Sequence, residues 1–295
     1  MKLQREFTDL SSMFDGAIFS SFVFNSDYFE RTLLKILSGK SLAEEIIICV
    51  DSGSYRETIE NDEVRLNSVG KEYYLCPIRM TNGRFHPKVY FFASEDRAAA
   101  FVGSANLTAH AFDQNQEIVT KFELKNTDDN DLDGPELAAL ADIHEFYSQL
   151  LEHPVAEAIG KTSKQKMEEL LETTMWVTET GSRDSTGQIT AVLHNLEVPL
   201  LDQIKSRLVD RGEEINQADI IAPFYGNSVS IPESLTNEGI DTRVWLQQDR
   251  TQVDITKLEL WEQKNENAET IVFDLDRYVH GKVLLIETDA ATYCL

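Results

Sequence analysis

The chain has 295 residues, of which 42% are hydrophobic and 26% are charged, an ordinary composition for a folded protein of one large or two medium domains. Acidic residues outnumber basic ones by 51 to 27, and the net charge of −24 disfavours indiscriminate coating of nucleic acid or anionic membranes. Residues 1 to 24 lack the basic start and apolar run of a secretory signal, and no later run approaches the ~18 apolar residues of a membrane span. We therefore expect a cytoplasmic protein that does not insert into a membrane.

The three cysteines show no spacing typical of a metal or redox site. Cys49, Cys76 and Cys294 each lie in an apolar stretch without a C-x-x-C pattern. We interpret them as reduced core residues, and we expect neither a metal nor an organic cofactor.

Strand and helix patterns alternate in the first part of the chain. Residues 21 to 37 change from an apolar strand-like run to apolar positions at helical spacing. The β-branched run at 46–50 stops at Asp51-Ser52-Gly53-Ser54, residues that favour a turn and can cap a following helix. Three strand patterns follow at 73–80, 85–93 and 99–108, and the sheet-rich segment ends near residues 117 to 124. This order predicts β–α units leading into further strands.

A polar segment separates this region from the next. Residues 126 to 134 are acidic and end in Gly-Pro, and the residues up to 178 are helical in pattern. We expect a solvated surface loop followed by a helical connector between two halves.

The order of patterns then repeats after a turn-rich patch at 180–187. An apolar pattern at 189–196 and a helical pattern at 200–212 are followed by strand patterns at 219–226, 241–249 and 270–287. The sequence predicts an α/β fold in which two related halves have mixed sheets flanked by helices. The expected boundaries are 1–125 for the first half, 126–180 for the acidic loop and helical connector, and 181–295 for the second half.

The strongest motif begins at His86-Pro87-Lys88. Gly103-Ser104-Ala105-Asn106 and Asn115-Gln116-Glu117 follow it, and a second HxK occurs at His280-Gly281-Lys282. This pattern resembles the phospholipase D superfamily, whose halves each carry an HxK…GSxN signature. The resemblance is specific over residues 84 to 117 and 277 to 287, and the β–α order extends it loosely over both halves.

The resemblance implies a phospholipase D-like fold and a metal-independent phosphodiesterase. In that superfamily two halves meet across a twofold or pseudo-twofold axis, so that one histidine attacks phosphorus and the other protonates the leaving oxygen. A phosphohistidine intermediate follows from this chemistry. The expected catalytic residues, at a cleft between the halves, are His86, Lys88, Ser104, Asn106, Glu117, His280 and Lys282.

Simple chemistry supports these assignments. Imidazole has a pKa near 6.5, so one ring can be neutral while another is protonated at physiological pH. On a strand, the HxK spacing would put His86 and Lys88 on one face, where the ammonium can contact phosphate oxygens. Ser104 and Asn106 can supply a hydroxyl and an amide. The superfamily often has Asp five positions after the Lys; that position is Ala93 here, and Glu117 is the better candidate for holding a histidine ring.

The second half contains an HxK without a GSxN. In the first half the Gly of GSxN comes 17 positions after the histidine, and the same offset from His280 falls at position 297, beyond Leu295. We expect a fragment that stops inside an apolar strand at 291–295, before the second GSxN strand.

Substrate choice stays open among three alternatives. A nuclease is the first choice, because the chain lacks a membrane segment and resembles nuclease-like and defence-associated bacterial members of the superfamily. The second alternative is a phospholipase D-type lipid phosphodiesterase. The third is a non-catalytic interaction or sensor module of a larger defence assembly. A nucleic-acid substrate, a homodimer and a larger protein assembly are the partners to test.

Overall fold

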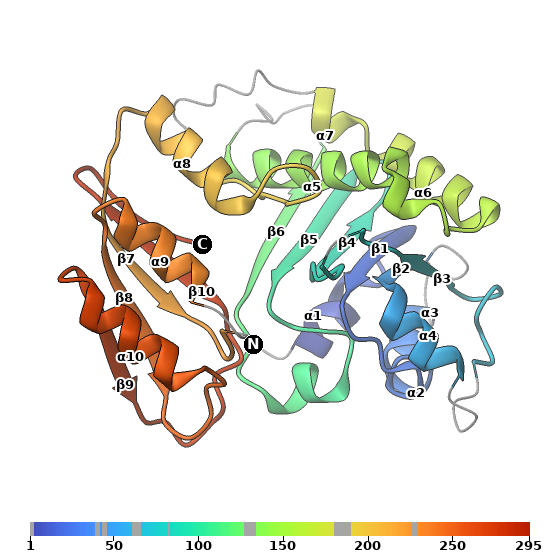
Figure 1. The fold of residues 1–295 in the computed structure, drawn as a ribbon. Helices are drawn as coiled ribbons and strands as arrows, with labels where there is room; N and C mark the ends of the chain where they lie inside the picture. The colour runs from blue at the N-terminus through green and yellow to red at the C-terminus, as the bar shows by residue number, and fades with distance from the viewer. Residues whose placement is uncertain are drawn as a thin grey trace. The chain divides into compact units, whose positions relative to one another are not determined.

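The computed structural model describes residues 3–38, 42, 46–60, 66–81, 83–126, 134–179, 190–225 and 229–295. These residues form two compact units (Figure 1), of which the first contains residues 1–114 and 119–197 and the second contains 115–118 and 198–295. Most of the predicted acidic loop and the turn-rich patch at 180–187 lie outside the described residues.

The first unit is built on a six-stranded mixed sheet with the order β3-β2-β1-β4-β5-β6. Its strands are β1 (Gly16–Ser21), β2 (Ile46–Asp51), β3 (Tyr74–Ile78), β4 (Val89–Ala93), β5 (Arg97–Gly103) and β6 (Val119–Lys125). Strands β1, β2 and β3 are parallel, whereas β4, β5 and β6 each run antiparallel to the strand before them in the sheet. The β-branched run of β2 is buried on both faces, which is the usual composition of a central parallel strand.

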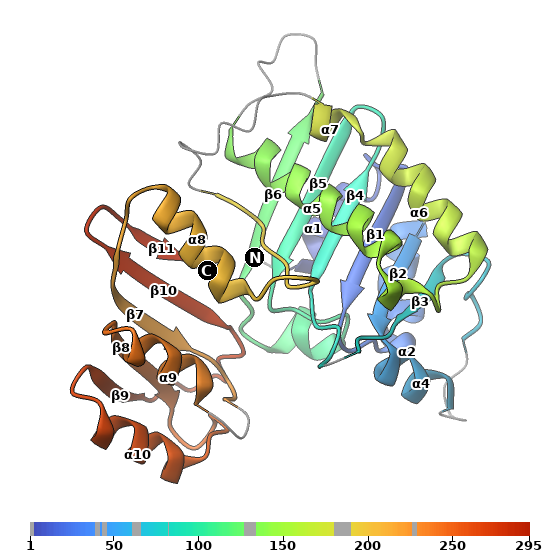
Figure 2. The ribbon, with the colours of Figure 1, turned by 45° about the horizontal axis from the view of Figure 1, so that its top comes forward.

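Helices cover both faces of this sheet (Figures 1 and 2). One face carries α5 (Pro135–Glu152) and α6 (Lys161–Thr173), with η3 (Pro154–Ala156) between them and α7 (Trp176–Glu179) after them. The other face carries α1 (Leu3–Leu10), α2 (Ser26–Tyr28), η1 (Phe29–Leu33), α3 (Leu34–Ser38) and η2 (His110–Gln114), while α4 (Ser52–Glu60) follows β2. Successive side chains of β1 point to opposite faces of the sheet. Ile18 packs in the core on the side of α5 and α6, and Phe19 packs in the core on the side of α1 and α3.

The helices at 135–179, expected in the connector, pack on the first sheet. The hydroxyl of Tyr147 on α5 donates to the carbonyls of Ile18 at 3.2 Å and Val89 at 3.1 Å, and it accepts from Ser20 Oγ at 3.1 Å. Helix α5 therefore belongs to the hydrophobic core of the first unit.

The second unit has a five-stranded sheet with the order β11-β10-β7-β8-β9. Its strands are β7 (Ile215–Ile221), β8 (Asp241–Gln247), β9 (Ala268–Phe273), β10 (Val283–Thr288) and β11 (Thr292–Cys294). Its helices are α8 (Leu200–Asp210), α9 (Ser230–Asn237) and α10 (Ile255–Lys264). The core lies between the sheet and α9 and α10, where Ile220 and Val244 meet Leu235 and Trp261.

The two sheets repeat one topology. Strands β7, β8 and β9 are parallel, and β10 and β11 follow β7 in antiparallel order, as β4 and β5 follow β1. Ser20 of β1 pairs with Val89, three residues after His86, and Ile221 of β7 pairs with Val283, three residues after His280. The predicted α/β fold with two related, helix-flanked mixed sheets is confirmed.

Some local expectations were wrong. The apolar run at 22–24 follows β1 instead of forming it, because the strand ends at Ser21. Cys49 and Cys76 are buried as predicted, but Cys294 is exposed, since it lies on the short edge strand β11. None of the helices that the structure describes combines the length and apolar character needed to cross a membrane.

Candidate active site

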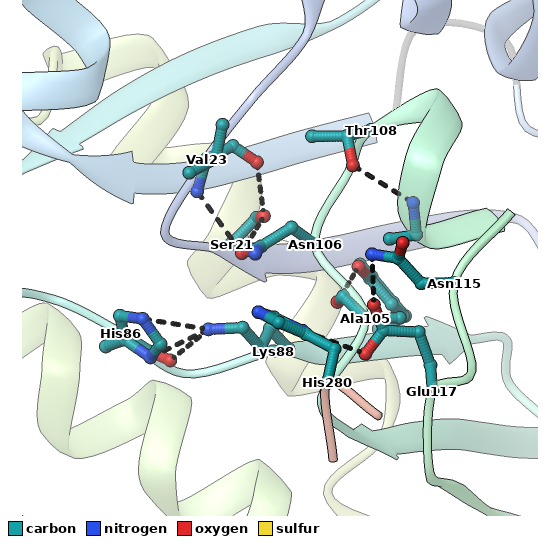
Figure 3. A network of polar contacts seen from close by, with 12 residues as sticks. Ser21, Val23, His86, Lys88, Ala105, Asn106, Thr108, Asn115, Glu117 and His280 are labelled. Carbon is teal, nitrogen blue, oxygen red and sulfur yellow. Dashed lines mark hydrogen bonds and ion pairs between the residues drawn. The ribbon is translucent and has the colours of Figure 1, made fainter. Parts of the chain in front are cut away.

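The first HxK segment lies immediately before β4. We expected His86 and Lys88 within a strand, but the strand begins at Val89, because Pro87 has no N–H to donate to a ladder. Lys88 is buried, and its Nζ lies 2.7 Å from His86 Nδ1 and 2.9 Å from the His86 carbonyl oxygen (Figure 3). The ring of Phe22, directly after β1, lies 4.5 Å from the His86 ring between centroids. The structure thus places a cation and an aromatic ring against this histidine.

The GSAN segment begins at Gly103, the last residue of β5. Asn106 Oδ1 accepts from the backbone N–H of Val23 at 3.3 Å and from Ser21 Oγ at 3.4 Å (Figure 3). The buried Tyr90 hydroxyl donates to the Ala105 carbonyl at 2.6 Å, which holds the loop against β4. Because the amide oxygen of Asn106 is used in this way, the NH2 end is the part of the side chain that can donate to an anion. Ser104 is buried beside it.

The second HxK segment meets a carboxylate within the second unit. Glu117 Oε2 lies 3.3 Å from His280 Nδ1, and Glu117 Oε1 accepts from Asn115 Nδ2 at 3.1 Å (Figure 3). The side chains of His280 and Glu117 are only 17% and 6% exposed. A carboxylate that accepts from Nδ1–H leaves Nε2 of a neutral ring with its lone pair. Glu117 can therefore set the tautomer of His280.

Residues 115–118 form a strap, a short segment that pairs with the chain around His280. Gln116 forms a parallel bridge with Val279, and the His280 N–H donates to the Gln116 carbonyl at 3.4 Å. Gly281 lies close to the strap, since a Cβ built on it would be 2.8 Å from Ile118 Cδ1. The strap brings Glu117 to His280 through backbone contacts.

The lysine of the second HxK also lies against an aromatic ring. Lys282 Nζ is 4.9 Å from the centroid of the Phe224 ring, which is 40% exposed and follows β7. Lys282 as a whole is exposed, but partial burial of its ammonium lowers its pKa, and the Glu117 carboxylate opposes that shift. Burial and the same carboxylate raise the pKa of Tyr278.

The structure thus groups the predicted site residues within each unit. His86, Lys88, Ser104 and Asn106 lie at the ends of β4 and β5 in the first unit, and Glu117 joins His280 and Lys282 in the second. Sequence reasoning missed Phe22 and Phe224. The sequence pattern that could have identified them is an aromatic residue within three positions after the end of the first strand in each half.

Comparisons with known proteins agree with this architecture. Residues 15–130 match the family model described as cardiolipin synthase, PLD-like domain. The yeast tyrosyl-DNA phosphodiesterase has a similar structure, with a TM-score of 0.57 at 12% identity over 96% of this chain and 77% of that one. A search of curated proteins found no match.

Two further structures resemble the chain with lower scores. Polyphosphate kinase from Porphyromonas gingivalis has a TM-score of 0.46 at 10% identity over 96% of this chain, which spans 41% of the kinase. Phosphatidylserine synthase from Haemophilus influenzae has a TM-score of 0.48 at 10% identity over 97% of this chain and 74% of that one. Residues 15–130 therefore match a PLD-like domain, and the chain has the fold of the yeast tyrosyl-DNA phosphodiesterase.

Proposed function

We propose that this protein is a metal-independent phosphodiesterase that cleaves nucleic acid through a phosphohistidine intermediate. The observation that carries the proposal is the repeat of one HxK segment before equivalent strands of two equivalent sheets. In each segment the lysine lies against an aromatic ring that also lies near the histidine. Imidazole and ammonium groups are suited to an anionic substrate with a poor leaving group.

In the mechanism that the resemblance implies, His86 and His280 divide the acid and nucleophile roles on one phosphodiester. The Nε2 of one ring attacks phosphorus while the bond to the leaving oxygen breaks, and the other ring gives its proton to that oxygen. Water then attacks the phosphohistidine, losing a proton to the second ring, which releases the first histidine and a phosphate monoester. Lys88, Lys282 and the NH2 of Asn106 stabilise the phosphate oxygens during both steps. Glu117 keeps Nε2 of His280 available.

Two observations favour nucleic acid over lipid as substrate. Phe224 is a partly exposed ring beside a lysine, an arrangement that can stack a base next to a contacted phosphate. The yeast enzyme of similar fold is by its name a tyrosyl-DNA phosphodiesterase. The name of the matching family model, cardiolipin synthase, makes a lipid phosphodiester the alternative substrate.

The test is cleavage of labelled single-stranded DNA, duplex DNA and RNA in EDTA by the full chain and by its His86→Ala and His280→Ala variants. His110→Ala is the matched control, because His110 is exposed and lies outside both HxK segments. We expect cleavage in EDTA that both site variants lose and the control keeps. Cleavage that survives in the site variants, or that requires added metal, would overturn the proposal.

The intermediate provides a second readout. Denaturing the enzyme during turnover should trap an acid-labile phosphoryl adduct, and mass spectrometry of peptides would assign it to His86 or His280. If only phosphatidyl substrates are cleaved, the mechanism stands and the nucleic-acid assignment is wrong.

A further inference from the structure

Each HxK segment lies outside the strand ladder, so another contact must set its position. In the first unit this contact comes from Asp51, the last residue of β2. Asp51 Oδ2 accepts from the backbone N–H of Phe85 at 3.0 Å, and Phe85 directly precedes His86. The Asp51 side chain is 3% exposed, so this is a buried charge-assisted hydrogen bond.

The other oxygen of Asp51 joins two further groups to this contact. Oδ1 accepts from the N–H of Gly53 at 3.0 Å, at the start of α4, and pairs with Arg84 Nη1 at 3.3 Å. A Cβ on Gly53 would lie 2.7 Å from Arg84 Nη1 and 3.0 Å from Asp51 Oδ1. One carboxylate therefore connects the end of β2, the first turn of α4 and the residues leading into His86.

The second unit has a counterpart at the last residue of β8. Gln247 Oε1 accepts from the N–H of Val279, which directly precedes His280, at 2.9 Å. Its Nε2 donates to the carbonyls of Leu275 at 3.1 Å and Arg277 at 2.7 Å. Gln247 is 4% exposed. These three hydrogen bonds fix the backbone that leads into His280.

The strand registers show that the two residues occupy equivalent positions. Cys49, two residues before Asp51, pairs with Ser20 of β1, and Ser20 pairs with Val89 of β4. In the second sheet Trp245, two residues before Gln247, pairs with Ile221 of β7, and Ile221 pairs with Val283 of β10. The same place in the fold thus supplies an acceptor to the residue before each histidine.

We propose that Asp51 and Gln247 are paired positioning residues that set the direction of the His86 and His280 rings by holding the preceding backbone N–H. The roles of the histidines rest on the proposed function, while the positioning effect does not. The two side chains differ because their neighbours differ. Asp51 accepts from three donors, whereas Gln247 must also donate to two carbonyls, which a carboxylate would repel.

The experiment measures the ring directly, by NMR of the full chain with ¹³C at histidine Cε1. Signals are assigned from His86→Gln and His280→Gln. We expect Asp51→Ala to move the His86 signal and to leave the His280 signal in place. Gln247→Ala should move the His280 signal and leave the His86 signal in place. Asp96→Ala and Gln248→Ala, changes at exposed residues of the same types, should move neither. If His86 and His280 keep their wild-type signals in the two variants, the proposal is overturned.

Conservative variants separate positioning from folding. Asp51→Asn keeps an acceptor for the Phe85 N–H but turns an NH2 towards the Gly53 N–H and Arg84, so it should move the His86 signal less than Asp51→Ala does. Gln247→Glu should still move the His280 signal, because its carboxylate faces the carbonyls of Leu275 and Arg277. If Asp51→Ala does not fold, Gln247→Ala and Gln247→Glu decide the question. On a substrate that the chain cleaves, Asp51→Ala should lower kcat about 10-fold to 100-fold with little change in KM, because a small misplacement of a reacting group has that effect. A chain that cleaves nothing but shows the NMR shifts would refute the enzyme and keep the positioning role.

Discussion

Individual side chains of this site are held by groups that do not react. Glu117 is held by Asn115, and the Asn106 amide is oriented through its oxygen by the first unit's backbone. Such contacts restrict each side chain to one direction before a substrate arrives, which lowers the cost of reaching the transition state. The consequences can be tested one residue at a time.

Replacing Glu117 with Gln should weaken catalysis by acting on His280. The amide keeps the size of the side chain but is a weaker acceptor for Nδ1–H and carries no charge to stabilise an imidazolium. We expect kcat to fall about 10²-fold, in the range for general acid–base effects, and the ¹³C signal of His280 Cε1 to move. Glu57→Gln, on the exposed side of α4, is the control. An unchanged kcat and an unchanged His280 signal would contradict the role of Glu117.

Replacing Asn106 with Asp tests the amide orientation. The carboxylate can still accept from Val23 and Ser21, so the fold should be retained, but it loses the NH2 donor and repels a phosphate. We expect a rise in KM together with a fall in kcat of at least about 10-fold. Steady-state kinetics with unchanged thermal unfolding would support this, and wild-type kinetics would refute it.

At the scale of elements, each unit is stabilised by contacts that its helices and loops make with the sheet or with the HxK segment. Helix α5 reaches the sheet through the Tyr147 hydroxyl, and the strap at 115–118 reaches the second HxK through backbone pairing. Both contacts join segments far apart in the sequence. The strap thus gives the second HxK a defined position although that segment lies outside the ladder.

Replacing Tyr147 with Phe should destabilise the first unit without changing its shape. The change removes a buried hydroxyl and leaves the Ser20 hydroxyl without this acceptor. Loss of buried hydrogen bonds of this kind costs about 1–3 kcal/mol in the free energy of unfolding. Tyr55→Phe, at a half-buried position on α4, is the control and should change stability by less than about 0.5 kcal/mol. Urea unfolding measures the difference, and equal stability of the two variants would contradict the expectation.

At the scale of the whole molecule, buried His144 and half-buried His194, both outside the site, should make stability depend on pH. Burial lowers the pKa of His144, although its Nε2 lies 2.9 Å from the Leu171 carbonyl and Glu145 is nearby. Burial also lowers the pKa of His194, against the effect of Glu145, Asp142 and Glu197. In the unfolded chain both rings have a pKa of about 6.5. The unfolded state therefore takes up protons first as the pH falls.

Stability should consequently be highest above about pH 6.5 and should decrease as the pH falls from there towards the lower folded-state pKa values. His144→Gln removes one of these groups and should reduce the difference in unfolding free energy between about pH 7.5 and 5.5. Urea unfolding at both pH values checks this, with His153→Gln, whose ring lies in a turn after α5, as the control. An equal pH dependence in the wild type and His144→Gln would show that His144 is not responsible.

Much of the fold could be predicted because its signals are local. The β-branched run at 46–50 and the turn residues after Asp51 predict a buried strand and a helix start, and both occur. Boundaries were less accurate near Pro87, where the apolar pattern continues but the missing N–H delays the strand until Val89. The exposure of Cys294 could not be predicted, because an apolar stretch does not reveal that its strand is at a sheet edge.

By itself the sequence determined the superfamily resemblance, the α/β class, the repeat of two halves and the identity of the HxK and GSAN residues, since each depends on residue type at short spacing. Only the tertiary structure decided which side chains hold them. Glu117 meets His280 from 163 positions away, and Asp51 and Gln247 reach the residues before the two histidines from 34 and 32 positions away. Such contacts depend on strand order and register, which are consequences of burying both faces of a sheet and are not encoded in any short segment.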